Sequence, residues 1–381
     1  MPTDPMRRTI IRGLALAWAF PAAARAAVDA GSAAHHVFAG GSIQDALEKA
    51  AKDPVRKTVV VHEGTYRPRA SGQALVFFNA RHEGITLEAQ GKVTLTAANP
   101  ALAAPRAPGG AAVVNHVVYF GNGLSRKTVF RGFKVTGANN FTTGTGQKSP
   151  IEDDGVFKST FFYTDGGGLK VYGRSYPTIE NVEVVDNYSS PCGGGASVEH
   201  LDAPTDAVLF RNCVFRGNRA QITGSALDVL HGSRAHLDNC LFVGNVANLG
   251  VDVVGMLGGG EFHPQNGSGA LTVFPRGQVS ARRCTFTGNW NGADDAGTGS
   301  VYEDCIFWQN TLGGGICPGG RYELDITDAS GVRGNFLGGA QDDLRGTIDA
   351  AKNTLRAPDP RFDAKFVPRA PQYAKAGYRP R

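Results

Sequence analysis

The densest set of acids, bases and cations in the sequence follows one short strand motif. Its five members are Lys170, Glu199, His200, Asp228 and His231. A base in this set could take the proton beside a uronate carboxylate while a cation neutralises the charge, as polysaccharide lysis requires. Two carboxylates, Glu199 with Asp228, could instead hydrolyse a glycosidic bond. The alternative is a solvated face that carries ordinary surface charges.

Polar and apolar residues alternate in this strand motif. The apolar pairs are Leu169/Val171, Ala196/Val198 and Leu227/Val229, with Lys170, Ser197 and Asp228 between their members. Because successive side chains of a strand point to opposite faces, an apolar interior would direct these three polar residues outward. Neighbouring strands lie about 4.8 Å apart, so the candidate residues are expected on adjacent coils of one surface.

A second strand motif, Cys-x-Phe-x-x-Asn, must position the first. Its four copies are residues 213–218, 240–245, 284–289 and 305–310. Cys and Phe lie on one face of a strand. The Asn is expected at a turn, where its short amide tolerates unusual backbone angles. The intervals between copies are in the range expected for stacked structural repeats.

A strand with one apolar face cannot bury that face alone, so the copies are expected to stack. Stacking places Cys over Cys, Phe over Phe and Asn over Asn, and each Asn could bond to the turn of the next coil. The pattern predicts an all-β chain that forms a single parallel β-helix solenoid. Charges two positions before the Cys alternate in sign and predict a ladder of surface ion pairs: Glu180, Arg211, Asp238, Arg282 and Glu303.

The first 26 residues have the features of an export signal. Arg7, Arg8 and Arg12 precede a short apolar run, and Ala24-Arg25-Ala26 offers a cleavage site. The sequence therefore predicts an exported protein, periplasmic or extracellular, with no transmembrane segment. Removing residues 1–26 would lower the formal charge from +5 to +2 by taking away four Arg and one Asp. This balance does not favour a nucleic-acid partner.

The six cysteines divide into two groups. Four belong to the repeat, where Cys behaves as a small apolar interior residue. Cys192 and Cys317 lie outside the repeat and could pair. No C-x-x-C spacing indicates zinc. Asp252, Glu261 and His263 in a glycine-rich stretch could bind a metal, and calcium is the one cofactor that stays open.

A short helix is expected at residues 42–52. Ser42 is suited to cap it, and Ile43, Ala46, Leu47 and Ala50 form an apolar stripe. A strand at residues 58–61 and the turn Glu63-Gly64-Thr65-Tyr66 follow. Such a helix would cover the first coil, which otherwise exposes a bare sheet edge.

These motifs resemble those of the pectate-lyase-like, right-handed parallel β-helix superfamily. The F-x-x-N ends of the four repeats are similar to those of chlamydial polymorphic outer membrane proteins, and residues 359–362, Asp-Pro-Arg-Phe, are similar to the close of many β-helix proteins. The resemblance spans roughly residues 40–365. It implies a right-handed coil but no single activity, because the superfamily includes lyases, hydrolases, epimerases, adhesins and structural proteins.

The expected organisation is a signal peptide at 1–26, a β-helix domain at 27–365 and an irregular tail at 366–381. Insertions at 138–166 and 250–268 interrupt the coils, and long loops on a rigid scaffold often carry function. The expected partner is a polysaccharide or cell-surface glycan that a monomer binds, and lyase or hydrolase cleavage is the expected chemistry if the chain is an enzyme. The alternative is a non-catalytic adhesin or surface-structural protein.

Overall fold

The computed structural model describes most of the chain after residue 32. The described residues are 33–103, 110–139, 147–148, 151, 157–158, 160–189, 192–201, 204–247, 269–312, 322–340 and 342–381. The proposed signal, Cys317 and the three candidate metal ligands Asp252, Glu261 and His263 lie outside them.

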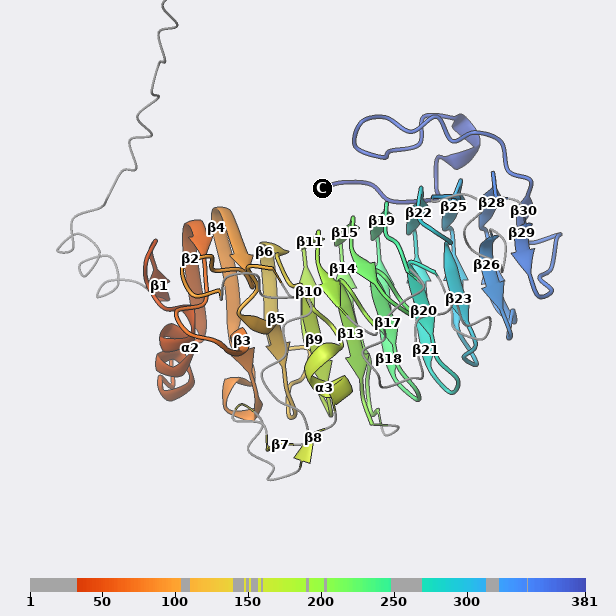
Figure 1. Ribbon diagram of the computed structural model, residues 1–381. Coiled ribbons are helices and arrows are strands. Elements are labelled where there is room, and N and C mark those ends of the chain that lie inside the picture. Colours follow the sequence, from red (N-terminus) through yellow and green to blue (C-terminus); the bar gives the residue numbers. More distant parts are fainter. Residues whose placement is uncertain are drawn as a thin grey trace, which may run out of the picture. The chain divides into compact units, whose positions relative to one another are not determined.

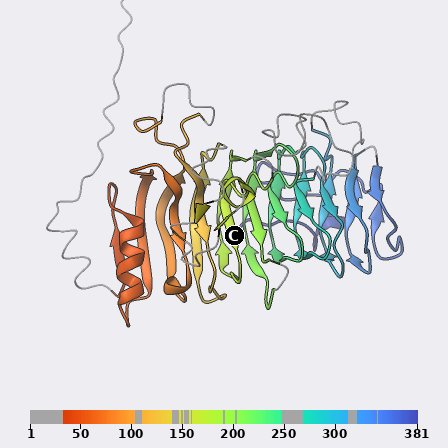
Figure 2. The ribbon, with the colours of Figure 1, turned by 60° about the horizontal axis from the view of Figure 1, so that its bottom comes forward.

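Short parallel strands stack into the three faces of a right-handed β-helix (Figures 1 and 2). Long strands near the N-terminus turn the corner between the first two faces: β2 Thr58–Tyr66, β4 Thr86–Thr96 and β6 Val129–Thr136, with β1 His35–Val37 beside β2. The first face continues in β10 Thr178–Glu180, β14 Val208–Arg211, β18 Arg234–Asp238, β21 Gln278–Arg282, β24 Val301–Glu303 and β27 Gly331–Arg333. The second continues in β11 Glu183–Val185, β15 Val214–Arg216, β19 Leu241–Val243, β22 Thr285–Thr287, β25 Ile306–Trp308, β28 Phe336–Gly338 and β30 Thr354–Leu355.

The third face is a separate nine-stranded sheet, and it carries the candidate site. Its strands are β3 Gly72–Phe78, β5 Val114–Phe120, β9 Leu169–Tyr172, β13 Ala196–Glu199, β17 Leu227–Val229, β20 Leu271–Val273, β23 Ala293–Asp295, β26 Tyr322–Ile326 and β29 Asp342–Arg345. The remaining elements are α2 Ile43–Lys52, α3 Thr160–Thr164, η1 Ala80–His82, η2 Pro371–Tyr373, the pair β7 Gln147–Lys148 and β8 Phe157–Lys158, and the pair β12 Tyr188–Ser189 and β16 Arg219–Ala220.

The repeat stacks in the predicted register inside the coils. The rings of Phe215, Phe242, Phe286 and Phe307 are all fully buried. Their centroids are 4.9, 4.4 and 4.6 Å apart, with interplanar angles of 3°, 5° and 3°. The four repeat cysteines are buried beside them. The predicted Phe column and the interior position of the cysteines are confirmed.

The repeat asparagines form the expected polar ladder. The amide of Asn218 donates to Val184 O (2.8 Å) and to Oδ1 of Asn245 (3.1 Å). The same pattern repeats at Asn245 and Asn289, and at the last rung Asn310 donates to the buried carboxylate of Glu323. The ladder therefore satisfies backbone carbonyls that the turns would leave buried and unpaired.

The unusual backbone angles lie elsewhere than predicted. Positive φ occurs at the residue before the ladder asparagine, for example at Gly217 and Gly244, and not at the asparagine itself. It also occurs at the residue before each repeat cysteine, at Asn212 (52°) and Arg283 (51°) among others. The ladder asparagine is needed for its side-chain hydrogen bonds rather than for its backbone freedom.

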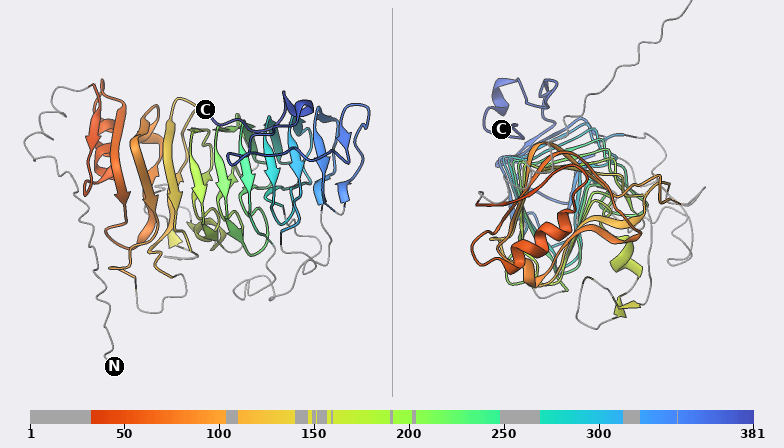
Figure 3. Two further views of the ribbon diagram at one scale, coloured as in Figure 1. Left: turned by 90° about the horizontal axis from the view of Figure 1, so that it is seen from above. Right: turned by 90° about the vertical axis from the view of Figure 1, so that its left-hand side faces the viewer.

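Helix α2 lies across the N-terminal end of the coils (Figure 3, right). The Ser42 hydroxyl accepts a hydrogen bond from Asp45 N (3.1 Å), and the buried side chains are the four of the apolar stripe. The Gln44 amide bonds to both Phe77 N (2.9 Å) and Phe77 O (3.2 Å) at the edge of β3. The helix thus pairs backbone groups that a bare edge would leave open.

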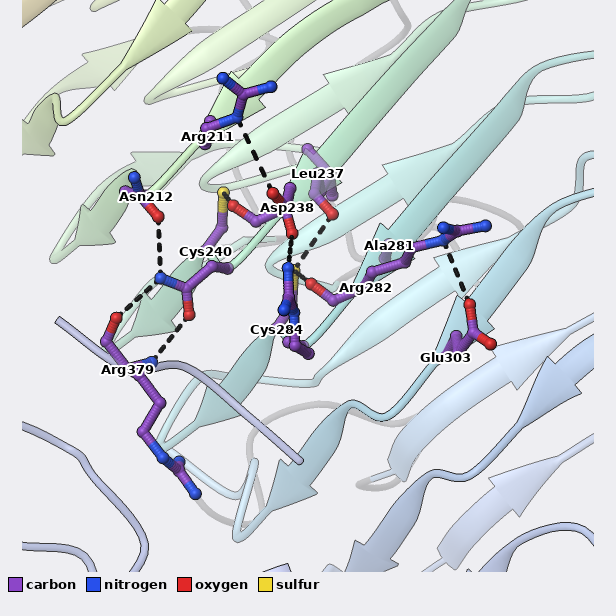
Figure 4. A network of polar contacts seen from close by, with 12 residues as sticks. Arg211, Asn212, Leu237, Asp238, Cys240, Ala281, Arg282, Cys284, Glu303 and Arg379 are labelled. Atoms are coloured by element: carbon purple, nitrogen blue, oxygen red, sulfur yellow. Dashed lines mark hydrogen bonds and ion pairs between the residues drawn. The ribbon is translucent and has the colours of Figure 1, made fainter. Parts of the chain in front are cut away.

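Alternating charges line the corner between the first and second faces (Figure 4). Arg211 lies 3.6 Å from Glu180 and 3.8 Å from Asp238, and Arg282 lies 3.1 Å from Glu303. These pairs confirm most of the predicted ladder. Asp238 departs from it, because its close partner is Arg283 (2.6 Å). Since the side chains are partly exposed, each pair contributes at most ~1 kcal/mol.

The C-terminal segment is irregular yet packed on the second face (Figures 1 and 4). Tyr373 is fully buried, and its ring lies 4.5 Å from that of Phe336. Near the end of the chain, Arg379 N donates to Asn239 Oδ1 (2.8 Å), and Asn239 Nδ2 donates to Arg379 O (2.7 Å). None of the helices among the described residues is both long and apolar enough to cross a membrane.

Candidate functional site

The outer row of the third face has the predicted register. Tyr119, Lys170, Ser197 and Asp228 are paired in turn across β5, β9, β13 and β17, and Thr272 and Asp294 continue the row on β20 and β23. The neighbouring apolar residues point into the core. The placement of Lys170, Ser197 and Asp228 on adjacent coils, on the side away from the core, is confirmed.

This row is not the solvated face that its outward direction suggested. Lys170 and Asp228 are both 0% exposed. A second layer, formed by α3 and the residues after it, covers Lys170 and its neighbours. The ring of Phe162 packs 5.7 Å from Tyr119 and 4.7 Å from Tyr172. The expectation of exposed charges fails because α3 and the residues after it pack over the coils.

Lys170 is the centre of a compact ionic cluster. Its Nζ lies 2.8 Å from Glu199 Oε2, 3.7 Å from Asp165 Oδ2 and 3.4 Å from Ser197 Oγ. Ser197 Oγ in turn donates to Asp165 Oδ2 (3.3 Å). Asp165 and Lys170 are buried, whereas 26% of the Glu199 side chain is exposed. Glu199 is therefore the part of the cluster that solvent reaches.

Asp165 is the member of the cluster that the candidate set missed. It follows α3, at the end of the acidic and aromatic insertion at 138–166. The composition of that insertion was the only signal in the sequence, because nothing in the coil register relates Asp165 to Lys170. A cation on a strand and an acid in an insertion meet only after the insertion has folded onto the third face.

Burial controls the charges of this cluster. Burial raises the pKa of Asp165 to about 6, against the opposing attraction of Lys170. Burial alone would lower the pKa of Lys170, but the Glu199 and Asp165 carboxylates outweigh it and the net pKa is raised. Lys170 is thus a permanent cation near neutral pH, which suits charge neutralisation and excludes it as a general base in this state.

Asp228 is a separate, buried acid. Thr223 Oγ1 donates to its Oδ2 (2.8 Å), and its Oδ1 has no hydrogen-bond partner among the described residues. Burial, followed by repulsion from Asp165, raises its pKa well above the ordinary range. Gly224 must be glycine here, because a Cβ would lie 1.9 Å from Asp228 Oδ1. The full burial of Asp228 and the contact of the Glu199 carboxylate with Lys170 do not favour the expected carboxylate pair of Glu199 with Asp228, which stays a prediction.

His200 does not face outward. Its side chain is 1% exposed, with Nε2 3.0 Å from Ser175 O and Nδ1 accepting from Arg234 N (3.1 Å). Burial lowers its pKa to about 4. His200 is therefore a neutral imidazole that ties two turns together, and its expected place in an open groove is wrong. Strand alternation itself gives this direction, because His200 has the same parity as the inward residues Ala196 and Val198.

His231 is exposed and lies apart from the ionic cluster. Its Nε2 accepts a hydrogen bond from Arg276 Nε (2.9 Å). No hydrogen bond or ion pair joins it to the other four candidates within the described part of the chain. The third face therefore brings Lys170 and Glu199 together and leaves Asp228, His200 and His231 in three different surroundings.

The residues that the structure describes contain no group of three or more His, Cys, Asp or Glu side chains arranged to hold a metal ion. Asp252, Glu261 and His263 are not among those residues, so a metal site there stays a prediction. Cys192 is buried, and burial raises its pKa well above the ordinary range. Its pairing with Cys317 also stays a prediction.

Comparison with known proteins gives structural similarity only. No protein-family model matches the chain, and no curated protein matches its sequence. The pectate lyase Pel9A is 15% identical, with 84% of this chain and 78% of that one covered and a TM-score of 0.41. The catalytic domain of a GH87 α-1,3-glucanase, in complex with tetrasaccharides, is 11% identical, with 85% and 68% covered and a TM-score of 0.29. The strand pairing itself identifies the chain as a parallel β-helix.

Proposed function

We propose that this chain is an exported protein that binds an extracellular or cell-envelope polysaccharide beside Glu199 and cleaves it there. The observation that carries the proposal is the cluster on the third face, in which one buried ammonium holds two carboxylates and only Glu199 reaches solvent. Glu199 is the candidate catalytic residue. Lys170 and Asp165 position it and set the local charge.

The cluster supports two forms of glycan cleavage. In an elimination, Glu199 takes the proton beside the uronate carboxylate, a carbon–carbon double bond forms, and the glycosidic oxygen leaves and takes a proton from water. Lys170 offsets the charge of the two carboxylates that it contacts, which reduces their repulsion of such an anionic substrate. In hydrolysis, Glu199 activates the attacking water instead. His231 is proposed as a further glycan contact, whereas buried His200 and Asp228 are not part of the reactive surface.

A non-catalytic adhesin or surface-structural protein is the second candidate. The full burial of Lys170 and the near-full burial of Asp165 favour it. A buried ion pair can serve to fix one layer on another rather than to react. Under this alternative, the cluster fastens the insertion to the third face and the outer surface of that layer meets the glycan.

Glu199→Gln separates the two candidates. The mature protein is incubated with uronate-containing and neutral polysaccharides, and unsaturated products and new reducing ends are measured. We expect a loss of at least ~100-fold in turnover, the contribution of a positioned acid–base group. Glu303→Gln is the matched control, because Glu303 is also ion-paired and its side chain is 27% exposed. Turnover that survives Glu199→Gln overturns the proposal, and binding without turnover of any polymer establishes the adhesin.

A further inference from the structure

A cavity opens where the capping helix meets the first strand of the third face. Its volume is about 490 Å³, within the range of small-ligand sites. It lies among the N-terminal end of α2, the end of β2 and the strand β3, and its walls include Gly41, Tyr66, Arg67, Arg69 and Phe77. The cavity is separate from the Lys170 cluster, but it lies on the same face of the coil.

The cavity is positively charged. Arg67 and Arg69 line it, and none of its lining residues is acidic. Within the described part of the chain, neither arginine forms an ion pair, whereas Arg211 and Arg282 at the corner ladder both contact carboxylates. The N-terminal end of α2 adds a partial positive charge at the same wall. The positive electrostatic potential of this cavity therefore suits an anionic ligand.

Hydrogen bonds hold the two guanidinium groups in place. Arg67 Nη1 donates to Ala98 O (2.8 Å), and Arg69 Nη2 donates to Gly40 O. Between them, buried Pro68 accepts a bond through its carbonyl from Asn99 Nδ2 (2.8 Å). Each guanidinium has five N–H donors, so these bonds leave most of them for a ligand. Such pre-organisation lowers the cost of binding.

We propose that this cavity binds the carboxylate of an acidic sugar, with one hexuronate unit as the occupant. Planar guanidinium groups match a carboxylate through paired hydrogen bonds. The rings of Tyr66 and Phe77 supply apolar wall against which the carbon face of a sugar can pack. The proposal specifies that the polysaccharide is acidic. Only the step from a single hexuronate unit to a polymer rests on the proposed function.

The cavity and the cluster belong to one row of strands. Phe77 is paired with Tyr119, and Tyr119 is paired with Lys170. Two strand spacings separate the cavity wall from Lys170, or about 10 Å. Because the layer formed by α3 and the residues after it covers Tyr119 and Lys170, a polymer held by one acidic unit in the cavity would reach Glu199 over the outer surface of that layer.

Calorimetric titration of the mature protein tests the inference without any turnover. Galacturonate and glucuronate are the probes, with glucose as the neutral sugar and inorganic phosphate as the anion without a sugar. We expect binding of a hexuronate and not of glucose, and a loss of at least ~10-fold in Arg67→Gln and in Arg69→Gln, as expected for a lost charged hydrogen bond. Arg67→Lys should also weaken binding. Lysine keeps the positive charge but lacks the paired N–H donors with which a guanidinium group holds a carboxylate.

Arg333→Gln is the control for charge alone, because Arg333 is an exposed arginine paired with Glu303 at the far end of the coil. Equal hexuronate affinity in the wild type and in both glutamine variants overturns the inference. So does phosphate binding without hexuronate binding, which would make the cavity a simple anion site. Hexuronate binding that depends on the arginines, in a protein for which Glu199→Gln changes nothing, upholds the cavity and overturns the proposed reaction alone.

Discussion

Asp165 and Lys170 carry opposite charges in a place from which water is excluded. Removing charges from water is expensive, and only close partners offset that cost. Lys170 has two carboxylates and one hydroxyl within reach, whereas Asp165 Oδ1 has no hydrogen-bond partner among the described residues. The asymmetry explains why the pKa of Asp165 is raised while Lys170 keeps its proton.

Asp165→Asn should remove one pH-dependent component of stability. The pKa of Asp165 is about 6 in the folded chain, above its ordinary value of 3.8. A group with a raised pKa favours folding below the unfolded value, and that contribution is lost as the pH rises through the folded value. Between about pH 4 and about pH 7, the wild type should lose roughly 2 kcal/mol relative to the variant.

Urea denaturation at the two pH values measures this difference. Asp349→Asn serves as the control, because the hydrogen bond from Lys352 lowers the pKa of that exposed carboxyl. Its stabilising contribution is lost mainly below about pH 4, so the control should change little between the two pH values. Parallel stability curves for the wild type and Asp165→Asn would show that Asp165 is not a buried acid.

At the scale of the element, three-residue strands gain stability from their neighbours. β15, β19, β22 and β25 each have three residues, and each places one phenylalanine on the next. No such strand is stable alone, because its apolar face is buried only by the coils on either side. The Asn ladder closes each turn with bonds to the same two neighbours.

Phe242→Ala should destabilise the chain by about 3–5 kcal/mol, the usual cost of removing a buried aromatic ring. Phe242 is stacked on both sides, by Phe215 and Phe286. Chemical denaturation with fluorescence detection measures the loss. Phe38→Ala is the comparison, because Phe38 is a partly exposed ring at the first coil, and its loss should cost much less. Similar losses for both variants would contradict the stacked interior.

For the described chain as a whole, the free energy of unfolding should be a sum of contributions from neighbouring coils. The C-terminal segment adds contacts that act as a strap across several coils. Gly377 N donates to Asp304 O (2.9 Å), and Tyr378 N donates to Thr285 Oγ1 (2.9 Å). Tyr373 and Ala376 pack on Ile306 at the second face. The segment thus joins several coils that otherwise meet only their nearest neighbours.

Removal of residues 371–381 should loosen the coils beneath the strap. We expect faster amide hydrogen exchange in β19, β22 and β25, with little change in β2 and β4, because solenoid contacts are local. The melting temperature should also fall, since Tyr373 and Tyr378 are both buried. Removal of exposed Arg381 alone is the control and should change neither measurement. If truncation increases amide exchange equally in all strands, the segment does not act as a local strap.

The sequence by itself determined the coil, its register and its interior. Cys, Phe and Asn recur with the strand period, and the apolar alternation around Lys170 and Asp228 orients the third face. These features are local, because the side-chain direction along a strand depends only on position parity. For the same reason, the apolar stripe of α2 and the alternating charges between the first and second faces could be predicted from residues close together in the sequence.

Only the tertiary structure decided which outward residues meet solvent and which meet one another. Asp165 joins Lys170 because the segment that follows α3 lies over the third face, and no period in the sequence encodes that contact. His200 is buried where its ring meets Ser175 O and accepts a hydrogen bond from Arg234 N, both in other coils. Arg67 and Arg69 line a cavity because α2 closes the end of the coil beside them. Each contact joins segments distant in the chain, so packing rather than spacing sets it.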